Sequence, residues 1–243
     1  MDAVVLDNVP FKLDFGALLK RLHVPEQSEH AAELRQLADE AEAVGQPRAM
    51  YKEVLIQSKG DQEVVIENVR LTSRVLRVNL DQAYKAFPFV ATCGAELDSW
   101  QPAVEGVLQA YWVDQLRELA LRAAINHMRQ VLTERHGLVH ASMMNPGSLP
   151  DWPLKEQRAL FTILGDPGAA IDVRLTPSML MVPIKSASGL LFPNQDSYEN
   201  CMLCTREDCP GRRAPYDPDL YDRKYRTAAE QPDAQKQLFH EVH

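Results

Sequence analysis

Cysteine is scarce in this chain, which has only four among its 243 residues. The amino-terminal stretch carries acidic residues early and lacks the basic segment and apolar run of an ordinary secretory signal peptide. We therefore expect a cytoplasmic protein whose thiols sit in a reducing compartment. Under those conditions metal binding by cysteine is favoured over a disulfide.

Long apolar runs and an excess of basic charge are absent as well. The longest apolar run, residues 179–184, has the length of a strand, whereas a membrane-spanning helix needs about 20 residues. The formal net charge is −8, so the chain as a whole is repelled by phosphate backbones. We expect neither a membrane nor a nucleic acid as a partner.

What is present is ordinary globular composition, with 45% hydrophobic and 25% charged residues. A chain of this length can bury a large core as one large domain or two small ones. We expect three parts, which are an N-terminal helical and strand segment packed on the core (1–84), the core itself (85–198) and a cysteine-motif tail (199–243).

Helices are indicated where apolar residues recur at three- and four-residue spacing. The pattern predicts helices over 15–22 and from an N-cap at Ser28 to 44. A longer helical segment is predicted from Pro102, with Asp114 capping a second stretch that ends at Gly137. A further helix is expected after an N-cap at Asp151, with Pro153 in its first turn, and it is expected to run to Gly165.

Strands are indicated by runs rich in Val, Ile, Leu and Phe. They are expected over 52–57, 63–66, 74–80, 87–93, 171–175, 178–184 and 190–192, with 186–189 as a turn. Helices and strands mix without a βαβ alternation. The sequence therefore predicts an α+β fold.

The strongest motif lies in the tail. Cys201, Cys204 and Cys209 have the spacing C-x2-C-x4-C, and Pro210 follows the last cysteine directly. A closely spaced cysteine pair followed by a Cys-Pro step is typical of iron–sulfur ligand runs. Zinc also takes C-x2-C pairs. A disulfide with a spare thiol, or thiols without a partner, is the alternative to a metal site.

A closed four-thiolate site needs one more ligand than the tail supplies. Cys93, the only cysteine outside the tail, is the candidate, although a small buried apolar-type residue is the simpler interpretation. Arg206, Arg212 and Arg213 surround the motif. They can attract an acidic partner, a corrinoid phosphate or the net charge of a thiolate cluster, or they form a solvated charge run.

Motifs between residues 87 and 198 occur in an order that resembles a known family. They are FPFVATCGAELDSW, LTERHG, NPGSLPDWPLKEQRALFTILG and IDVRLTPSMLMVPIKSASGLLFPNQDSY, which together cover a little under half of the chain. The chain resembles the reactivation domain of vitamin B12-dependent methionine synthase and its stand-alone relatives. The resemblance implies a C-shaped α+β fold with a twisted antiparallel sheet flanked by helices, which binds S-adenosylmethionine and sits over a corrinoid.

The resemblance also implies binding residues. In that family a Pro-Gly turn holds S-adenosylmethionine through backbone groups and approaches the corrinoid, and a Ser-x-Ser-Gly segment and a tyrosine follow. The matching positions in this sequence are Asn145, Pro146, Gly147, Ser148, Ser186, Ser188, Gly189 and Tyr198.

Three positions depart from the family pattern. The family's arginine, which binds the ligand's carboxylate, corresponds to Met143, its tyrosine corresponds to Ser148, and a helical glutamate falls near Asn126. A methionine cannot replace a bidentate guanidinium–carboxylate contact. Its loss is expected to weaken binding of S-adenosylmethionine by roughly 1.5–3 kcal/mol, on the order of tenfold to a hundredfold.

The cysteine tail resembles an extension found in stand-alone anaerobic relatives. Together these features predict an accessory protein for corrinoid methyl-transfer chemistry, with an Fe–S cluster, more consistent with 4Fe-4S than with zinc, for reductive activation of cobalt. Cys201, Cys204 and Cys209, with Cys93 or an outside group, are the expected ligands. A corrinoid protein or free corrinoid and an electron-donor protein are the expected partners, and no catalytic residue is assigned.

Two alternatives stay open at this point. One is a non-catalytic protein-interaction module stapled by zinc. The other is methionine synthase reactivation that still depends on S-adenosylmethionine.

Overall fold

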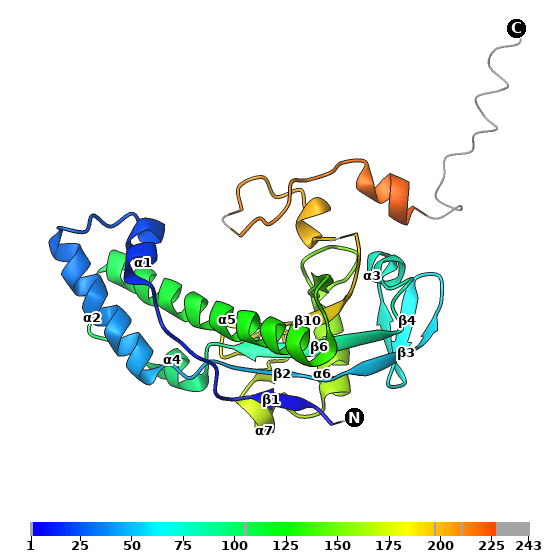
Figure 1. The fold of residues 1–243 in the computed structure, drawn as a ribbon, viewed down its shortest axis with the longest axis horizontal. Helices are drawn as coiled ribbons and strands as arrows, with labels where there is room; N and C mark the ends of the chain where they lie inside the picture. Colours follow the sequence, from blue (N-terminus) through cyan, green and yellow to red (C-terminus); the bar gives the residue numbers. More distant parts are fainter. Residues whose placement is uncertain (1, 105, 197, 210, 227–243) are drawn as a thin grey trace, which may run out of the picture.

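An eight-stranded antiparallel sheet organises the residues that the computed structural model describes, which are 2–104, 106–196, 198–209 and 211–226 (Figure 1). The strands follow the order β1-β2-β6-β3-β4-β5, and β10 pairs with both β6 and β7. Their bounds are β1 Val4–Leu6, β2 Arg48–Tyr51, β3 Val54–Lys59, β4 Glu63–Ile66, β5 Val69–Thr72, β6 Lys85–Thr92, β7 Ala141–Met144 and β10 Ser186–Pro193. A separate two-stranded ribbon pairs β8 (Arg174–Leu175) with β9 (Met181–Val182).

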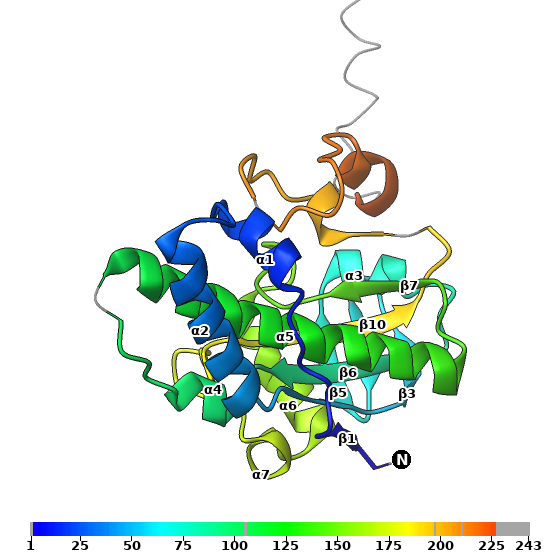
Figure 2. The same cartoon turned by 60° about the vertical axis from the view of Figure 1, so that its left-hand side comes forward.

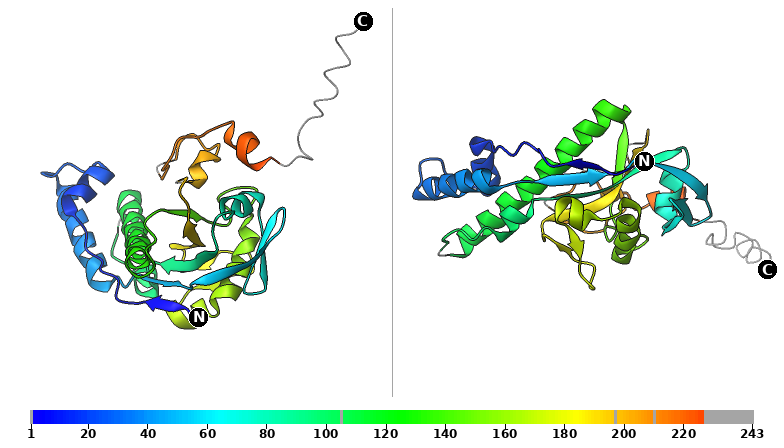
Figure 3. Two further views of the ribbon diagram at one scale, coloured as in Figure 1. Left: turned by 45° about the vertical axis from the view of Figure 1, so that its right-hand side comes forward. Right: turned by 90° about the horizontal axis from the view of Figure 1, so that it is seen from below.

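Helices cover both faces of the sheet. Their bounds are α1 Phe15–Leu22, α2 Glu29–Val44, α3 Arg74–Asn79, α4 Ala95–Ser99, α5 Val107–His136, α6 Gln157–Leu164 and α7 Pro167–Ile171. Figure 3 shows α5 on one side of the sheet and α6 with α7 on the other. The observed architecture is therefore α+β with an antiparallel sheet flanked by helices, as the sequence predicts.

Strand β6 separates the two main parts of the core by the alternation of its side chains. Phe87 and Phe89 belong to a hydrophobic cluster with Trp112 and Leu116 of α5, which we call the helix-side cluster. Ala86 belongs to a second cluster, which we call the tail-side cluster; its other members include Leu190, Trp152, Tyr198 and Tyr225. The tail is thus part of the core on one side of the sheet.

The ribbon has a C-shaped outline. Helices α1 and α2 stand at one end, the sheet and α5 form the middle, and α3 with β3 and β4 stands at the other end (Figures 1 and 2). The segment after β10 lies above the sheet in these views. The same outline is visible after a 45° rotation in the left view of Figure 3. Among the described residues, no helix has the length and apolar character that crossing a membrane requires.

The two helices predicted near the N-terminus are confirmed, and so is the predicted N-cap of the second. Helix α1 covers Phe15–Leu22, and α2 starts after Ser28, whose side chain accepts a hydrogen bond from the backbone N–H of Ala31. Strand β4 has the predicted bounds, and the predicted strand 87–93 is confirmed as most of β6.

The predicted strand over 74–80 is wrong, because this segment forms α3. Val75, Leu76, Asn79 and Leu80 are buried, and this spacing places them on one helical face. The side chain of Ser73 caps the helix by accepting a hydrogen bond from the N–H of Leu76 at 2.9 Å.

Two further predictions of strand and helix bounds are wrong. The long helix begins at Val107 and runs unbroken to His136, so neither Pro102 nor Asp114 starts a helix. Residues 171–175 and 178–184 contribute only the end of α7 and the short strands β8 and β9. Asp172 and Met179 have positive φ angles of 59° and 66°, which extended strands do not accommodate.

The segment 186–189 is part of strand β10 and is not a turn. Ser186, Ser188 and Gly189 each pair with a residue of β6 in the antiparallel register. The small residues of this segment gave it the composition of a turn. Its hydrogen bonds to β6 nevertheless keep it extended.

Asp151 caps a different helix from the one predicted. Its carboxylate accepts hydrogen bonds from the backbone N–H groups of Arg74 at 3.2 Å and Val75 at 3.0 Å, and from the hydroxyl of Ser73. The predicted helix itself is confirmed as α6, which ends at Leu164 before Gly165 and is preceded by a single 3-10 turn, Leu154–Glu156. Asp151 therefore ties the loop after β7 to the first turn of α3.

Asp151→Ala is expected to lower the free energy of unfolding by about 1–3 kcal/mol, because it leaves the donors at the start of α3 without their acceptor. Chemical denaturation followed by circular dichroism measures the change. Asp39→Ala is the matched control, since Asp39 is exposed on α2 and such surface substitutions stay within about 0.5 kcal/mol. Equal stability of the two variants would contradict the capping role.

Candidate functional site

The turn between β7 and Trp152 is fixed by its own backbone. Gly147 has a φ of +83°, in the left-handed region that favours glycine. Its N–H donates to the carbonyl of Trp152 at 2.7 Å, and the N–H of Ser148 donates to the carbonyl of Asn145 at 3.1 Å. A side chain at Gly147 would also meet Leu154, whose Cδ1 lies 2.9 Å from the position of a Cβ.

Strand β10 holds this turn against the sheet. The Nδ2 of Asn145 donates to the backbone carbonyl of Ser188 at 2.8 Å. The approach requires glycine at the next position, because a Cβ on Gly189 would lie 2.6 Å from the Nδ2 of Asn145 and 2.6 Å from the carbonyl oxygen of Met144. The structure thus brings the Pro-Gly turn into contact with the Ser-x-Ser-Gly segment of β10, the two segments to which the resemblance assigns ligand binding.

The serines of β10 have different environments. The hydroxyl of Ser186 contacts the Oγ1 of Thr92 at 2.9 Å and the carbonyl of Pro183 at 2.7 Å, so it is used within the protein. The hydroxyl of Ser188 is buried and has no hydrogen-bond partner among the described atoms. Unpaired buried polar groups are costly, and water or a ligand usually satisfies them.

Tyr198 lies in the tail-side cluster, which also contains Leu149 and Trp152 from beside the turn. Its side chain is buried, its hydroxyl has no partner among the described atoms, and its ring stands edge-on to that of Tyr225 with 6.2 Å between the centroids. Burial, with a further contribution from Tyr225, raises the pKa of this phenol above its usual value. Tyr198 is therefore buried in the core as a neutral phenol, and its part in binding a ligand stays a prediction.

The positions that depart from the family pattern do not meet at the turn. Met143 is buried in the helix-side cluster, so its side chain packs inside the core. Asn126 lies on α5 and lines a cavity of about 510 Å³ with Asp14 and Arg21 of the α1 region. Neither supplies a charged contact for a ligand carboxylate at Ser148.

One arginine organises the cysteine segment, residues 201–213. The guanidinium of Arg212 donates to the backbone carbonyls of Cys201 at 3.0 Å and Cys204 at 3.2 Å. It also donates to the carbonyls of Arg206 and Ala214. Four carbonyls converge on one cation, so Arg212 sets the course of the backbone that carries the cysteines.

The three tail thiols are free and partly exposed. The backbone N–H of Arg213 contacts the Sγ of Cys201 at 3.4 Å. Across the described residues, however, no three His, Cys, Asp or Glu side chains are grouped so that they could hold a metal ion. The structure brings the three cysteines into one short segment, and the metal site itself stays a prediction.

Cys93 belongs to a different part of the molecule. It is fully buried in the helix-side cluster, whereas Cys204 packs against the tail-side cluster. Desolvation, with a smaller contribution from Asp98, raises the pKa of the Cys93 thiol to about 12. The interpretation of Cys93 as a small buried core residue is confirmed, and it does not join the tail cysteines as a ligand in this arrangement.

The cysteine segment begins beside the Asn145–Ser148 turn. Glu199 forms an isolated parallel bridge with Met143 of β7, two residues before that turn. Met202, Leu203 and Cys204 then pack against the tail-side cluster, which contains Leu149 and Trp152 from the far side of the turn. Two motifs about 55 residues apart in the sequence therefore start from adjacent backbone.

The fold defines the class of protein that the chain resembles. A crystal structure of the MetH reactivation domain bound to AdoHcy matches with a TM-score of 0.56 over 82% of this chain and 80% of that chain, at 15% sequence identity. At this identity the similarity establishes the fold. No protein-family model matches the sequence, and no curated protein does so either.

Sequence reasoning missed the roles of the arginines near the cysteines. Arg212 points inward to carbonyls, and Arg213 pairs with Glu199 at 2.8 Å. Arg206 and Arg213 are exposed, whereas Arg212 is only partly exposed. An arginine next to a Pro-Gly step carries no local signal that its side chain will turn back on its own loop.

Gly189→Ala is expected to displace the Asn145–Ser148 turn and to lower the free energy of unfolding by about 1–3 kcal/mol, because the new methyl group overlaps Asn145 and Met144. Thermal or chemical denaturation measures this. Gly16→Ala is the control, since its Cβ would lie 3.4 Å from its nearest neighbour, Asp14 Oδ1. That helical substitution is expected to be neutral or stabilising by about 0.5–1 kcal/mol. A neutral Gly189→Ala would contradict the close approach.

Proposed function

We propose that this protein is a corrinoid-associated accessory protein for methyl-transfer chemistry, in which the tail cysteines carry an Fe–S cluster for reductive activation of cobalt. The observation that carries the proposal is the bridge between Glu199 and Met143. It places the start of the cysteine segment beside the turn that a reactivation-type fold would present to a corrinoid.

The donor set is consistent with a cluster. Cys201, Cys204 and Cys209 are free thiols at partly exposed positions, and iron–sulfur clusters are bound by cysteine thiolates. Arg212 holds the backbone of two of them, and the N–H of Arg213 faces the sulfur of Cys201. Because Cys93 is buried elsewhere, we propose that the fourth ligand comes from outside this cysteine set.

A bound cluster would supply a low-potential electron, which reduction of Co(II) to Co(I) requires. The chain's own residues do the rest: the Asn145–Ser148 turn presents backbone groups, and the sheet fixes its position relative to the cysteine segment. We propose a corrinoid protein or a free corrinoid as the partner, and a separate electron-donor protein as the source of the electron. The reducing cytoplasm is the compartment that this chemistry needs.

A second candidate is reactivation that depends on S-adenosylmethionine. It is favoured by the bound AdoHcy in the structural neighbour. The burial of Met143 argues for weaker binding of the amino-acid end of such a ligand, because no arginine replaces the missing charge at this position. Calorimetric titration with S-adenosylmethionine distinguishes the two, since only the second candidate requires saturable heat.

Protein purified without oxygen is expected to contain iron and acid-labile sulfide. It is also expected to show the broad absorption of a thiolate-bound cluster at about 400 nm. Cys204→Ala is expected to lose most of both, because it removes a ligand. Cys93→Ala is the matched control and is expected to keep them. Zinc in a colourless protein would support the stapled interaction module instead, and unchanged iron in Cys204→Ala would rule out the proposed ligand set.

Cob(II)alamin is expected to bind saturably, with a change in its absorption spectrum. Asn145→Ala is expected to weaken this binding about fivefold, because it removes the hydrogen bond to Ser188 that fixes the turn, worth about 1 kcal/mol. Asn126→Ala is the control and is expected to bind as the unmodified protein does. Absence of a spectral change, together with absence of a complex with a corrinoid protein, would contradict the proposed function.

A further inference from the structure

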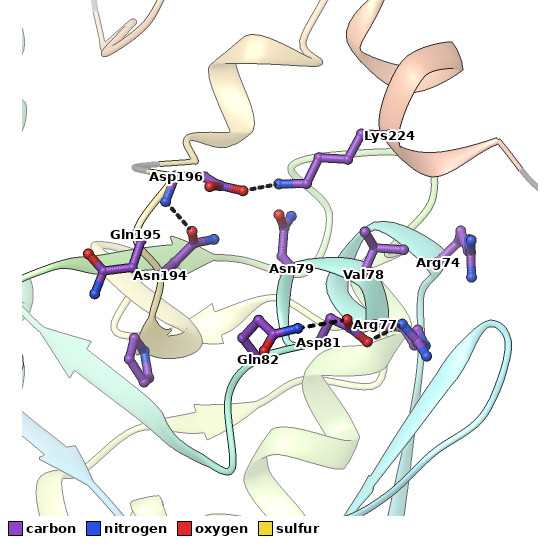
Figure 4. A pocket seen from close by; sticks show the side chains of 11 residues that line it. Arg74, Arg77, Val78, Asn79, Asp81, Gln82, Asn194, Gln195, Asp196 and Lys224 are labelled. Carbon is purple, nitrogen blue, oxygen red and sulfur yellow. Dashed lines mark hydrogen bonds and ion pairs between the residues drawn. The ribbon is translucent and has the colours of Figure 1, made fainter.

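A polar cavity of about 600 Å³ lies beside α3, and none of its lining residues belongs to the Asn145–Ser148 turn or to the cysteine segment. Three segments line it, namely α3 with the residues that follow it, the end of β10 with residues 194–196, and Lys224 (Figure 4). Figure 4 shows the Asp196–Lys224 pair above, and Gln82, Asp81 and Arg77 below. The tail returns to α3 and contributes Lys224 to the wall of this cavity.

Buried hydrogen bonds fix the tail at this place. The hydroxyl of Tyr225 donates to the Oδ1 of Asn79 at 3.1 Å, and both side chains are buried. The Nε of Arg74 donates to the backbone carbonyl of Tyr225 at 3.0 Å. The wall formed by Lys224 is therefore held rigidly relative to α3.

The cavity is positively charged in an acidic protein. Arg74, Arg77 and Lys224 line it together with Asp81 and Asp196, which gives a formal charge of +1. Arg77 pairs with Asp81 at 2.8 Å, and Lys224 pairs with Asp196 at 2.7 Å. The two carboxylates hold the cations in place and leave a single net charge for a ligand.

Several donors on the residues that line the cavity are unpaired among the described atoms. The Nε of Arg77 donates to the carbonyl of Gly60 and the Nη1 of Arg74 donates to that of Asp61, so one terminal nitrogen of each guanidinium has no partner among the described atoms. The side chain of Gln195 is exposed and makes no described hydrogen bond. Guanidinium and amide N–H groups are the donors that phosphate oxygens accept from.

We propose that this cavity binds a monoanionic phosphodiester. A net charge of +1 matches one phosphodiester charge better than the dianion of a phosphate monoester. A volume of about 600 Å³ is in the range of small-molecule sites and exceeds what a bare anion fills, so the substituents of the phosphate also enter. The amides of Asn194, Gln195 and Gln82 suit hydroxyl or carboxamide groups on those substituents.

Such a phosphodiester has two sources. It is part of the nucleotide loop of a complete corrinoid, a source that rests on the proposed function, or it belongs to a free small molecule. Cobalamin has the phosphodiester, cobinamide lacks it, and dimethyl phosphate is the simplest free form. These three probes separate the sources.

The variant for the test is Gln195→Glu, which puts a negative charge into the cavity without removing a described contact. Arg135→Gln changes the net charge by the same amount at an exposed position outside the cavity. Cobalamin and cobinamide binding are measured by calorimetry, and dimethyl phosphate binding is measured by phosphorus NMR line broadening. Circular dichroism confirms that both variants are folded.

Gln195→Glu is expected to weaken binding of the phosphodiester probe about tenfold, while Arg135→Gln changes it less than about twofold. Preference for cobalamin over cobinamide, lost in Gln195→Glu, assigns the corrinoid source. If dimethyl phosphate binds in a manner that depends on Gln195 and cobalamin does not bind, the ligand is a free phosphodiester. This result supports the cavity proposal and contradicts the proposed corrinoid function. Equal binding of cobalamin and cobinamide with no dimethyl phosphate binding overturns the proposal and leaves the corrinoid function standing. No binding of any probe overturns both.

Discussion

Strand β10 is the element on which the rest of the structure depends. It pairs with β6 along Ser186–Leu191 and with β7 along Leu190–Pro193, so its backbone joins the two strands. At Gly189 it admits the Asn145 side chain into contact with the sheet, which no other residue type would allow. After β10 the chain continues directly into Tyr198 and the cysteine segment. The turn, the sheet and the tail are therefore positioned by one strand.

The tail is a structural part of the fold. Tyr198 and Tyr225 are buried in one cluster with Trp152 and Phe192, and the hydroxyl of Tyr225 reaches Asn79 of α3. Loss of this packing would expose apolar surface and so destabilise the fold. The cysteine segment lies between the two tyrosines in the sequence and is therefore held at both of its ends. A segment anchored in this way has the fixed position that a redox centre or a partner-binding surface needs.

Local signals predicted much of the fold. Ser28 marked the start of α2 because a serine side chain satisfies an N–H that the helix leaves unpaired. The apolar run over 87–93 predicted a buried strand, and β6 is one. The predictions failed at 74–80 and 186–189, where composition indicated a strand and a turn but distant partners decided otherwise. Asp151 stabilises α3 within residues 74–80, and pairing with β6 keeps residues 186–189 extended.

By itself the sequence determined the α+β class, the cysteine spacing and the Pro-Gly turn, because these depend on periodicity and on residue types next to one another. Only the tertiary structure decided that Cys93 lies apart from the tail cysteines, that Arg212 binds the carbonyls of its own loop, and that α3, β10 and Lys224 enclose one polar cavity. Each of these involves side-chain direction or contact between distant segments. Neither property follows from local sequence, because burial and pairing are set by the whole sheet.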